Sequence, residues 1–283
     1  MRLRNTTAPN LPLATRTYEQ QYIDQLNNVL RLYFNQLDNF TTAISTTGGG
    51  SNLQFPSGAW HQDGNTTLAA NITNVSTTPI QVASTDGFLS AGALMIGTEL
   101  ISYTGKTSTT FTGITRGVYG STKAAHTAGV YVSEAQPVPS STTALTIAFT
   151  YTDVANGVDV DPTDSTKIVC QTAGYYNFQF SIQLLTYDST IDNVTLWFRQ
   201  NGVDIAYSAG IITVPSVHGG VAGATIASWN LVLPVNAGDY IQLIMSSTTG
   251  NTVAATYPPG TAPVRPISPS IIMTATFVSA LYT

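Results

Sequence analysis

The stretch Tyr175-Tyr-Asn-Phe-Gln-Phe-Ser-Ile-Gln-Leu-Leu185 alternates without a break between two kinds of side chain. The apolar set is Tyr176, Phe178, Phe180, Ile182 and Leu184, and the set between them is Tyr175, Asn177, Gln179, Ser181 and Gln183. Successive side chains of a β-strand point to opposite faces. The stretch therefore predicts a strand with one apolar face directed at a core.

Further runs of this kind follow at the spacing that is typical of a β-sandwich. The predicted strands lie at 144–150, 194–200, 204–207, 224–232, 239–246 and 271–281. Asn201-Gly202 is a two-residue hairpin signal between two of them, and Asn236-Ala-Gly-Asp239 predicts a turn. We expect residues 144–283 to form a sandwich.

A second, smaller β-module is predicted over residues 76–134, with strands at 79–83, 93–96, 99–104, 110–115 and 130–133 separated by glycine turns. Arg116 lies between turn glycines, where its guanidinium could pin a loop by hydrogen bonds to carbonyls or pair with Glu99. Residues 135–143 are a linker by composition, and residues 41–75 are predicted as a linker with irregular β segments.

The segment 17–40 predicts a helix with a narrow apolar stripe. The stripe residues, spaced alternately by three and four, are Ile23, Leu26, Leu30, Tyr33, Leu37 and Phe40. Thr17 is the expected N-cap, with Gln20 as its capping-box partner. Such a stripe favours a short coiled coil between copies of the chain; the alternative is a single amphipathic helix packed on its own domain.

Residues 1–16 predict an extended arm, because Pro9 and Pro12 disfavour regular structure. Basic and apolar residues recur along it, namely Arg2, Arg4, Leu11, Leu13 and Arg16. A cationic arm on an acidic protein could dock on a larger particle; the alternative is a solvated terminus.

Composition limits the classes of function. The 283 residues carry a net charge of −5 and only 9% charged side chains, which argues against binding nucleic acid through its phosphates. The scarcity of long charged side chains favours surface that neighbouring copies can bury, although a secreted β-protein would also fit. A single cysteine, Cys170, excludes an intrachain disulfide. We expect neither a signal peptide nor a membrane span.

Catalytic and metal-binding patterns are weak. The histidines His61, His126 and His218 have no zinc-ligand spacing, and nucleotide-binding and nucleophile motifs are missing from the sequence. Asp153, Asp159, Asp161 and Asp164 could hold Ca²⁺ in a loop, but turn acids are favoured.

Other candidate groups are no stronger. A carboxylate pair of Asp188 and Asp192 has no support from spacing. Tyr187, Tyr207 and Tyr257 could stack on sugars, but packing in the core or at a trimer axis is favoured for each. We therefore expect no enzyme activity, no cofactor and no metal.

Three segments resemble known families. The elements Ile96-Gly-Thr-Glu-Leu-Ile-Ser-Tyr-Thr-Gly105 and Phe111-Thr-Gly-Ile-Thr-Arg-Gly-Val-Tyr-Gly-Ser-Thr122 resemble a small β-module of bacteriophage tail-fibre and virion proteins. The opening, Arg4-Asn-Thr-Thr-Ala-Pro-Asn-Leu-Pro12 and the helix after it, is similar to N-termini of virion structural proteins from marine tailed phages, including cyanophages.

The C-terminal part resembles the trimeric jelly roll of the C1q and tumour-necrosis-factor-like family. The matching segments are 172–178, 196–202, 231–243 and 271–281. Within them the turn and core signature is Gly174, Tyr175, Phe178, Trp197, Asn201, Gly202, Gly238 and Asp239. The ending, Phe277-Val-Ser-Ala-Leu281, departs from the usual Phe-Ser-Gly-Phe-Leu of C1q proteins. The resemblance implies a ten-stranded jelly roll assembled as a tight homotrimer.

Together these features predict a mainly β chain with an N-terminal arm, a short coiled-coil helix, a small β-module and a C-terminal jelly-roll sandwich. The leading hypothesis is a phage virion structural protein: a homotrimeric fibre, spike or head appendage on the capsid or tail surface. Its arm would bind capsid or tail proteins, and its outer head would contact a glycan or protein of the host surface. The alternatives are a polysaccharide-degrading tailspike enzyme and a soluble C1q-like lectin.

Overall fold

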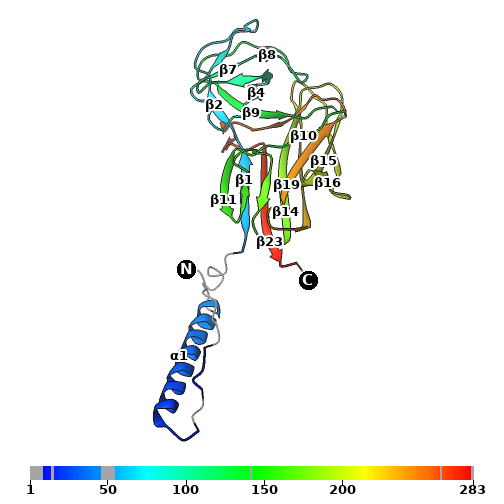
Figure 1. Ribbon diagram of the computed structural model, residues 1–283. Coiled ribbons are helices and arrows are strands. Elements are labelled where there is room, and N and C mark those ends of the chain that lie inside the picture. The colour runs from blue at the N-terminus through cyan, green and yellow to red at the C-terminus, as the bar shows by residue number, and fades with distance from the viewer. Residues whose placement is uncertain (1–8, 14–15, 46–54, 141, 262, 282–283) are drawn as a thin grey trace. The chain divides into compact units, whose positions relative to one another are not determined.

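The computed structural model describes residues 9–13, 16–45, 55–140, 142–261 and 263–281 (Figure 1). The chain divides into two compact units, Met1–Phe55 and Pro56–Thr283. The described residues are mainly β, with antiparallel sheets and one α-helix. That helix is not long and apolar enough to cross a membrane, and no other helix occurs among the described residues.

The first unit contains helix α1, Gln20–Ser45. It extends past the predicted end at Phe40, so the first part of the predicted linker 41–75 is helical. All six stripe residues are half-buried within the single chain, while most of their neighbours are exposed. Arg2 and Arg4 of the arm lie outside the described residues; Leu11 and Leu13, which are described, are exposed and lie outside helices and strands.

The second unit is built on two facing sheets. The larger sheet contributes β1 (Ser57–Gln62), β11 (Tyr151–Asn156), β14 (Gly174–Thr186), β18 (Gly223–Val235), β20 (Thr252–Ala255) and β23 (Ile271–Ser279). The other sheet contains β10 (Leu145–Thr146), β12 (Val158–Val160), β13 (Ile168–Cys170), β15 (Asp192–Gln200), β16 (Val203–Asp204), β17 (Gly210–Val214) and β19 (Tyr240–Ser247).

The core between these sheets confirms the alternation in β14. Its apolar set, from Tyr176 to Leu184, is fully buried against side chains such as Leu196 and Phe198 of β15 and Leu243 of β19. Burying an aromatic or branched aliphatic side chain contributes about 1.5–3 kcal/mol. The packing of β14 is therefore a principal contribution to the stability of the sandwich.

The strands between β1 and β10 form an insertion in the sandwich. They are β2 (Asn65–Thr67), β3 (Ile80–Gln81), β4 (Gly92–Ile96), β5 (Glu99–Tyr103), β6 (Gly105–Lys106), β7 (Thr110–Thr112), β8 (Thr115–Arg116) and β9 (Tyr131–Pro137). Figure 1 shows them gathered at one end of the sandwich. They enclose a separate apolar cluster that includes Leu68, Ile80, Phe88 and Phe111.

Two boundaries differ from the prediction. Within the predicted linker 41–75, Ser57–Gln62 is strand β1, which pairs with β11 and β23 and buries Trp60 in the sandwich core. The predicted linker 135–143 begins inside β9, which pairs with β20 of the sandwich. Pro137 at the end of β9 suggested a loop, yet Gln136 is buried and its side chain bonds both backbone groups of Ala148 at 3.0 Å.

Arg116 performs both of the roles considered for it. Its Nε and Nη2 donate to Glu99 at 2.6 and 2.7 Å, and its other bonds reach the carbonyls of Thr73 at 3.0 Å and Ala124 at 2.6 Å. His126 Nε2 lies 2.8 Å from the same carboxylate. Burial alone would raise the pKa of Glu99, but the hydrogen bonds from Arg116 and His126 hold it below its ordinary value.

A second buried acid, Glu134, lies on β9 where the insertion meets the sandwich. The Tyr103 hydroxyl lies 3.1 and 3.2 Å from its two carboxyl oxygens. Burial raises the pKa of Glu134 well above its ordinary value, against the opposing effects of the Tyr103 bond and the Lys106 charge. The surroundings of this carboxyl therefore favour its protonated form.

We expect Arg116→Met to lower the free energy of unfolding by about 3–5 kcal/mol, because Glu99 would remain buried without its cation. Arg199→Met is the matched control: its ion pair with Asp204 is exposed and should contribute less than about 1 kcal/mol. Urea unfolding of both variants measures this. Equal losses would contradict the structural role of Arg116.

Glu134→Gln should remove a pH dependence of stability. Below the unfolded pKa of 4.5 the carboxyl is protonated in both states, so it contributes no slope. Above 4.5 the folded state keeps a proton that the unfolded state has lost, so wild-type stability falls by up to about 1.4 kcal/mol per pH unit until the raised pKa is passed. Urea unfolding from pH 4 to 8 should show the free energy of unfolding of the variant rising relative to that of the wild type as pH rises. A constant difference between the two proteins across this pH range would refute a raised pKa for Glu134.

Candidate functional site

The outward side of β18, β14 and β23 carries no Asp, Glu, Lys, Arg or His. We call it the uncharged face, and it consists of Asn177, Gln179, Ser181, Gln183, Ile226, Ser228, Asn230, Val232, Ile272, Thr274, Thr276 and Val278. The strand register places them in rows, for example Asn230, Gln179 and Thr274. This face is the less apolar set of the β14 alternation, extended across three strands.

Apolar side chains on this face remain open to solvent. Ile226 is 65% exposed, Val278 is 57% exposed, and Val232 and Ile272 are also exposed. A shallow hollow of about 230 Å³ lies among Gln179, Ser181 and Ile272. Covering such a surface requires no desolvation of charge, which is the main cost of burying polar surface. Depletion of charged residues is also the compositional mark of an interface core.

The β18 strand borders this face with an open edge. Its thirteen residues pair with β14 on one side, and no other described strand pairs with it. A long edge with exposed Ile226 and Val232 offers unpaired backbone groups to another chain unless something covers it. The uncharged face and the β18 edge are therefore adjacent surfaces that both favour contact with protein.

Charged side chains occur beside the uncharged face and on the opposite sheet. At the β1–β11 side, His61 Nδ1 lies 2.8 Å from Asp153 Oδ2, and the His61 ring stacks on Tyr151 with centroids 5.1 Å apart. On the other sheet Arg199 donates to Asp204 at 2.7 Å. The lack of charge is thus a property of one face rather than of the whole surface.

Most of the signature residues serve the framework of the sandwich. Asn201 and Gly202 both have positive φ, as a tight hairpin turn requires, and Asn201 donates to Asp239 at 2.7 Å. The same carboxylate accepts the Asn236 backbone N–H at 2.8 Å beside Gly238, so the two predicted turns are joined.

Three other signature residues surround the core. Gly174 is packed so closely that an added Cβ would lie 2.2 Å from the Phe277 ring; Phe178 is buried, and Tyr175 lies half-buried on the outward side.

Trp197 does not belong to the core. It alternates with buried Leu196 and Phe198 on β15, so it faces outward, and its indole N–H donates to Asp204 at 2.9 Å. The tyrosines also differ from one another: Tyr207 is fully exposed with a positive φ of 64°, whereas Tyr187 and Tyr257 are half-buried against a small apolar cluster. Tyr207 is therefore not part of the core of its own chain, and trimer-axis packing stays a prediction for it.

The acidic candidates have local structural partners. Asp153 and Asp159 lie on strands β11 and β12 rather than in a loop. Asp161 accepts from Thr163, whose hydroxyl is the main cause of its lowered pKa, and Asp164 accepts from Thr166 and Lys167. Among the described residues, no group of three or more His, Cys, Asp or Glu is placed to hold a metal ion.

Asp188 and Asp192 also bind separate partners. Asp188 accepts from Asn251 at 2.7 Å, which lowers its pKa. Asp192 is buried, which raises its pKa, but bonds from Thr252 and Thr248 outweigh this and lower it. A general acid needs a raised pKa, so neither carboxyl is tuned for that role.

No protein-family model matches this chain, and no curated protein matches it either.

Proposed function

We propose that the chain is a structural protein of a tailed-phage virion, a homotrimeric fibre, spike or head appendage. Its N-terminal arm binds capsid or tail proteins, and its sandwich forms the outer head and contacts the host surface. The observation that carries this proposal is the uncharged face next to the open edge of β18. The sequence resemblances supply the virion context.

The geometry of these two surfaces favours a closed ring. A face and an edge are different surfaces, so a contact between them is heterologous, and repeating it gives a ring where the rotation closes, rather than a two-fold dimer. Each copy would place its uncharged face against the edge of the next. Three copies is the number that the C1q-like resemblance implies.

The order of strands supports a jelly roll. One layer runs β1-β23-β14-β18, and the facing layer runs β13-β19-β15-β17. Most successive strands of this set lie in opposite layers, and only the pair β15 and β17 stays within one layer, as in the two interlocked Greek keys of that fold. In this interpretation the eight insertion strands β2–β9 lie in the connection after the first strand.

The helix supports assembly of the N-terminal unit. The stripe from Ile23 to Phe40 is only half-buried within one chain, and Ile44 continues its spacing within α1. A coiled coil would cover this stripe. A stripe of about three heptads gives a coiled coil of limited stability alone. The helix would therefore align chains that the sandwich holds together.

Ser181→Asp should weaken the trimer, because it would bury a carboxylate without a partner in the centre of the uncharged face. Thr195→Asp is the control, since Thr195 is equally half-buried on the outward side of the other sheet. Sedimentation equilibrium should show at least about tenfold weaker association for Ser181→Asp alone. Unchanged association of Ser181→Asp, or equal dissociation of both variants, would contradict the proposed interface.

Deleting residues 1–16 should leave the trimer intact and abolish incorporation into virions, since the arm precedes helix α1. Immunogold electron microscopy of virions, with an antibody against the sandwich, measures incorporation. Normal labelling of particles made with the truncated chain would overturn the anchoring role, and absence of label on wild-type virions would overturn the virion assignment itself.

A further inference from the structure

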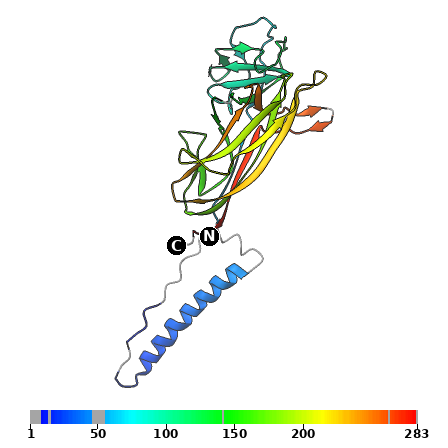
Figure 2. The same cartoon turned by 90° about the vertical axis from the view of Figure 1, so that its right-hand side faces the viewer.

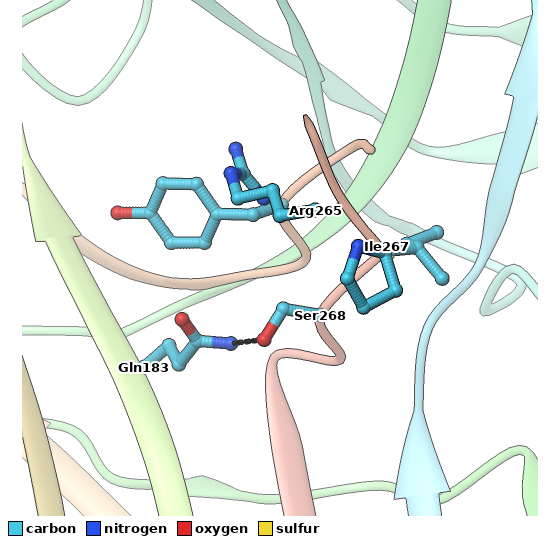
Figure 3. Close-up of a pocket in the computed structure, with 6 residues that line it drawn as sticks. Gln183, Arg265, Ile267 and Ser268 are labelled. Atoms are coloured by element: carbon cyan, nitrogen blue, oxygen red, sulfur yellow. Dashed lines mark hydrogen bonds between the residues drawn. The ribbon is translucent and has the colours of Figure 1, made fainter. Parts of the chain in front are cut away.

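A pocket of about 440 Å³ opens at one end of the uncharged face. It is lined by Gln183, Tyr257, Arg265, Pro266, Ile267 and Ser268 (Figure 3). Its wall includes the hairpin of β21 (Gly260–Thr261) and β22 (Val264–Arg265), which stands out from the sheets in Figure 2. The volume lies within the range of small-molecule sites, about 300–1,000 Å³.

Arg265 brings an unpaired cation to this pocket. Among the described residues of the second unit, the side chains of Lys106, Arg116, Lys167 and Arg199 bond to carbonyls or carboxylates, whereas those of Arg265 and Lys123 make neither an ion pair nor a hydrogen bond. Of these two cations only Arg265 lines the pocket. Its guanidinium lies 5.8 Å from the centroid of the Tyr257 ring. In a protein of net charge −5, an exposed guanidinium without an acidic partner is available to an anion.

The hairpin holds Arg265 in place. Gly260 pairs with Arg265, and a Cβ at Gly260 would lie 2.6 Å from Arg265 Cγ, so only glycine leaves room for the arginine stem. Tyr257 and Ser268 exchange backbone hydrogen bonds of 2.9 and 3.0 Å at the base of the hairpin. Prolines at 263 and 266 restrict the backbone on either side of β22. Such restriction lowers the entropy cost of binding.

The opposite wall offers neutral hydrogen-bonding groups. Gln183 Nε2 donates to Ser268 Oγ at 2.6 Å and to the Pro269 carbonyl at 2.7 Å, which occupies both of its protons. Its Oε1 therefore remains as an acceptor, and Figure 3 shows it turned toward the side of the pocket where Arg265 lies. The Ser268 hydroxyl keeps a proton to donate.

We propose that this pocket binds a carboxylate-bearing sugar residue, a hexuronate. Arg265 would take the carboxylate through two parallel N–H bonds. Gln183 Oε1 and the Ser268 hydroxyl would accept from and donate to ring hydroxyls, and the Tyr257 ring and Ile267 supply apolar wall. This gives the proposed host-contacting head a ligand class and rests on that function.

The test uses saturation-transfer NMR and calorimetry on the full chain, with D-glucuronate and D-galacturonate as probes and glucose and acetate as controls. At least one uronate should bind, about tenfold or more tightly than either control, since a charge-assisted pair and the sugar contacts both contribute. R265Q should lose about tenfold or more in affinity. K123Q should bind as the wild type does, because Lys123 is exposed and is not part of the pocket.

Failure of both uronates to bind would overturn the proposal, as would unchanged binding by R265Q. Acetate binding as tightly as a uronate would overturn recognition of the sugar ring, and glucose doing so would overturn recognition of the carboxylate. Arg265 is exposed, so R265Q should unfold at the same urea concentration as the wild type. The oligomeric state is measured separately by mass. A wild-type protein that is trimeric but binds neither uronate would therefore contradict the proposed sugar site without contradicting the proposed assembly.

Discussion

The two-sided alternation of β14 is the constraint on which the sandwich depends. One side, from Tyr176 to Leu184, fills the core, and the other side is the centre of the uncharged face. A shift of one residue in register would exchange these two sides and expose the aromatic core. Pairing with β18 and β23 over most of its length fixes the register, so core and outward face are determined together.

The strands of strong local pattern could be predicted from the sequence, and the role of Arg116 could be argued from its turn glycines and from Glu99. The first sandwich strand could not. Ser57–Gln62 is separated from its partners by the whole insertion, and its only large apolar side chain is that of Trp60. Likewise the end of β9 extends into the predicted linker 135–143. The Gln136 side chain forms hydrogen bonds with both backbone groups of Ala148, and composition does not reveal these contacts.

The candidate surfaces were hidden for a related reason. The uncharged face combines three strands that are distant in sequence, so its lack of charge becomes visible only with the register known. The Arg265 pocket joins β14 to a late hairpin in the same way. By contrast, the signature turns at Asn201 and Asp239 were local patterns, and the structure brings them together by hydrogen bonds. Trp197 lies on the outward side of β15 because it alternates with buried Leu196 and Phe198. The apolar character of its side chain alone did not show this position.

The proposed assembly requires that neighbouring copies of the chain cover the uncharged face and the β18 edge. Native mass spectrometry of the purified chain tests it most directly. We expect a species of three times the chain mass of 29.9 kDa that persists on dilution. A monomer that stays folded and soluble over the same range of concentration would contradict it, because both surfaces would then be stable in water without a partner.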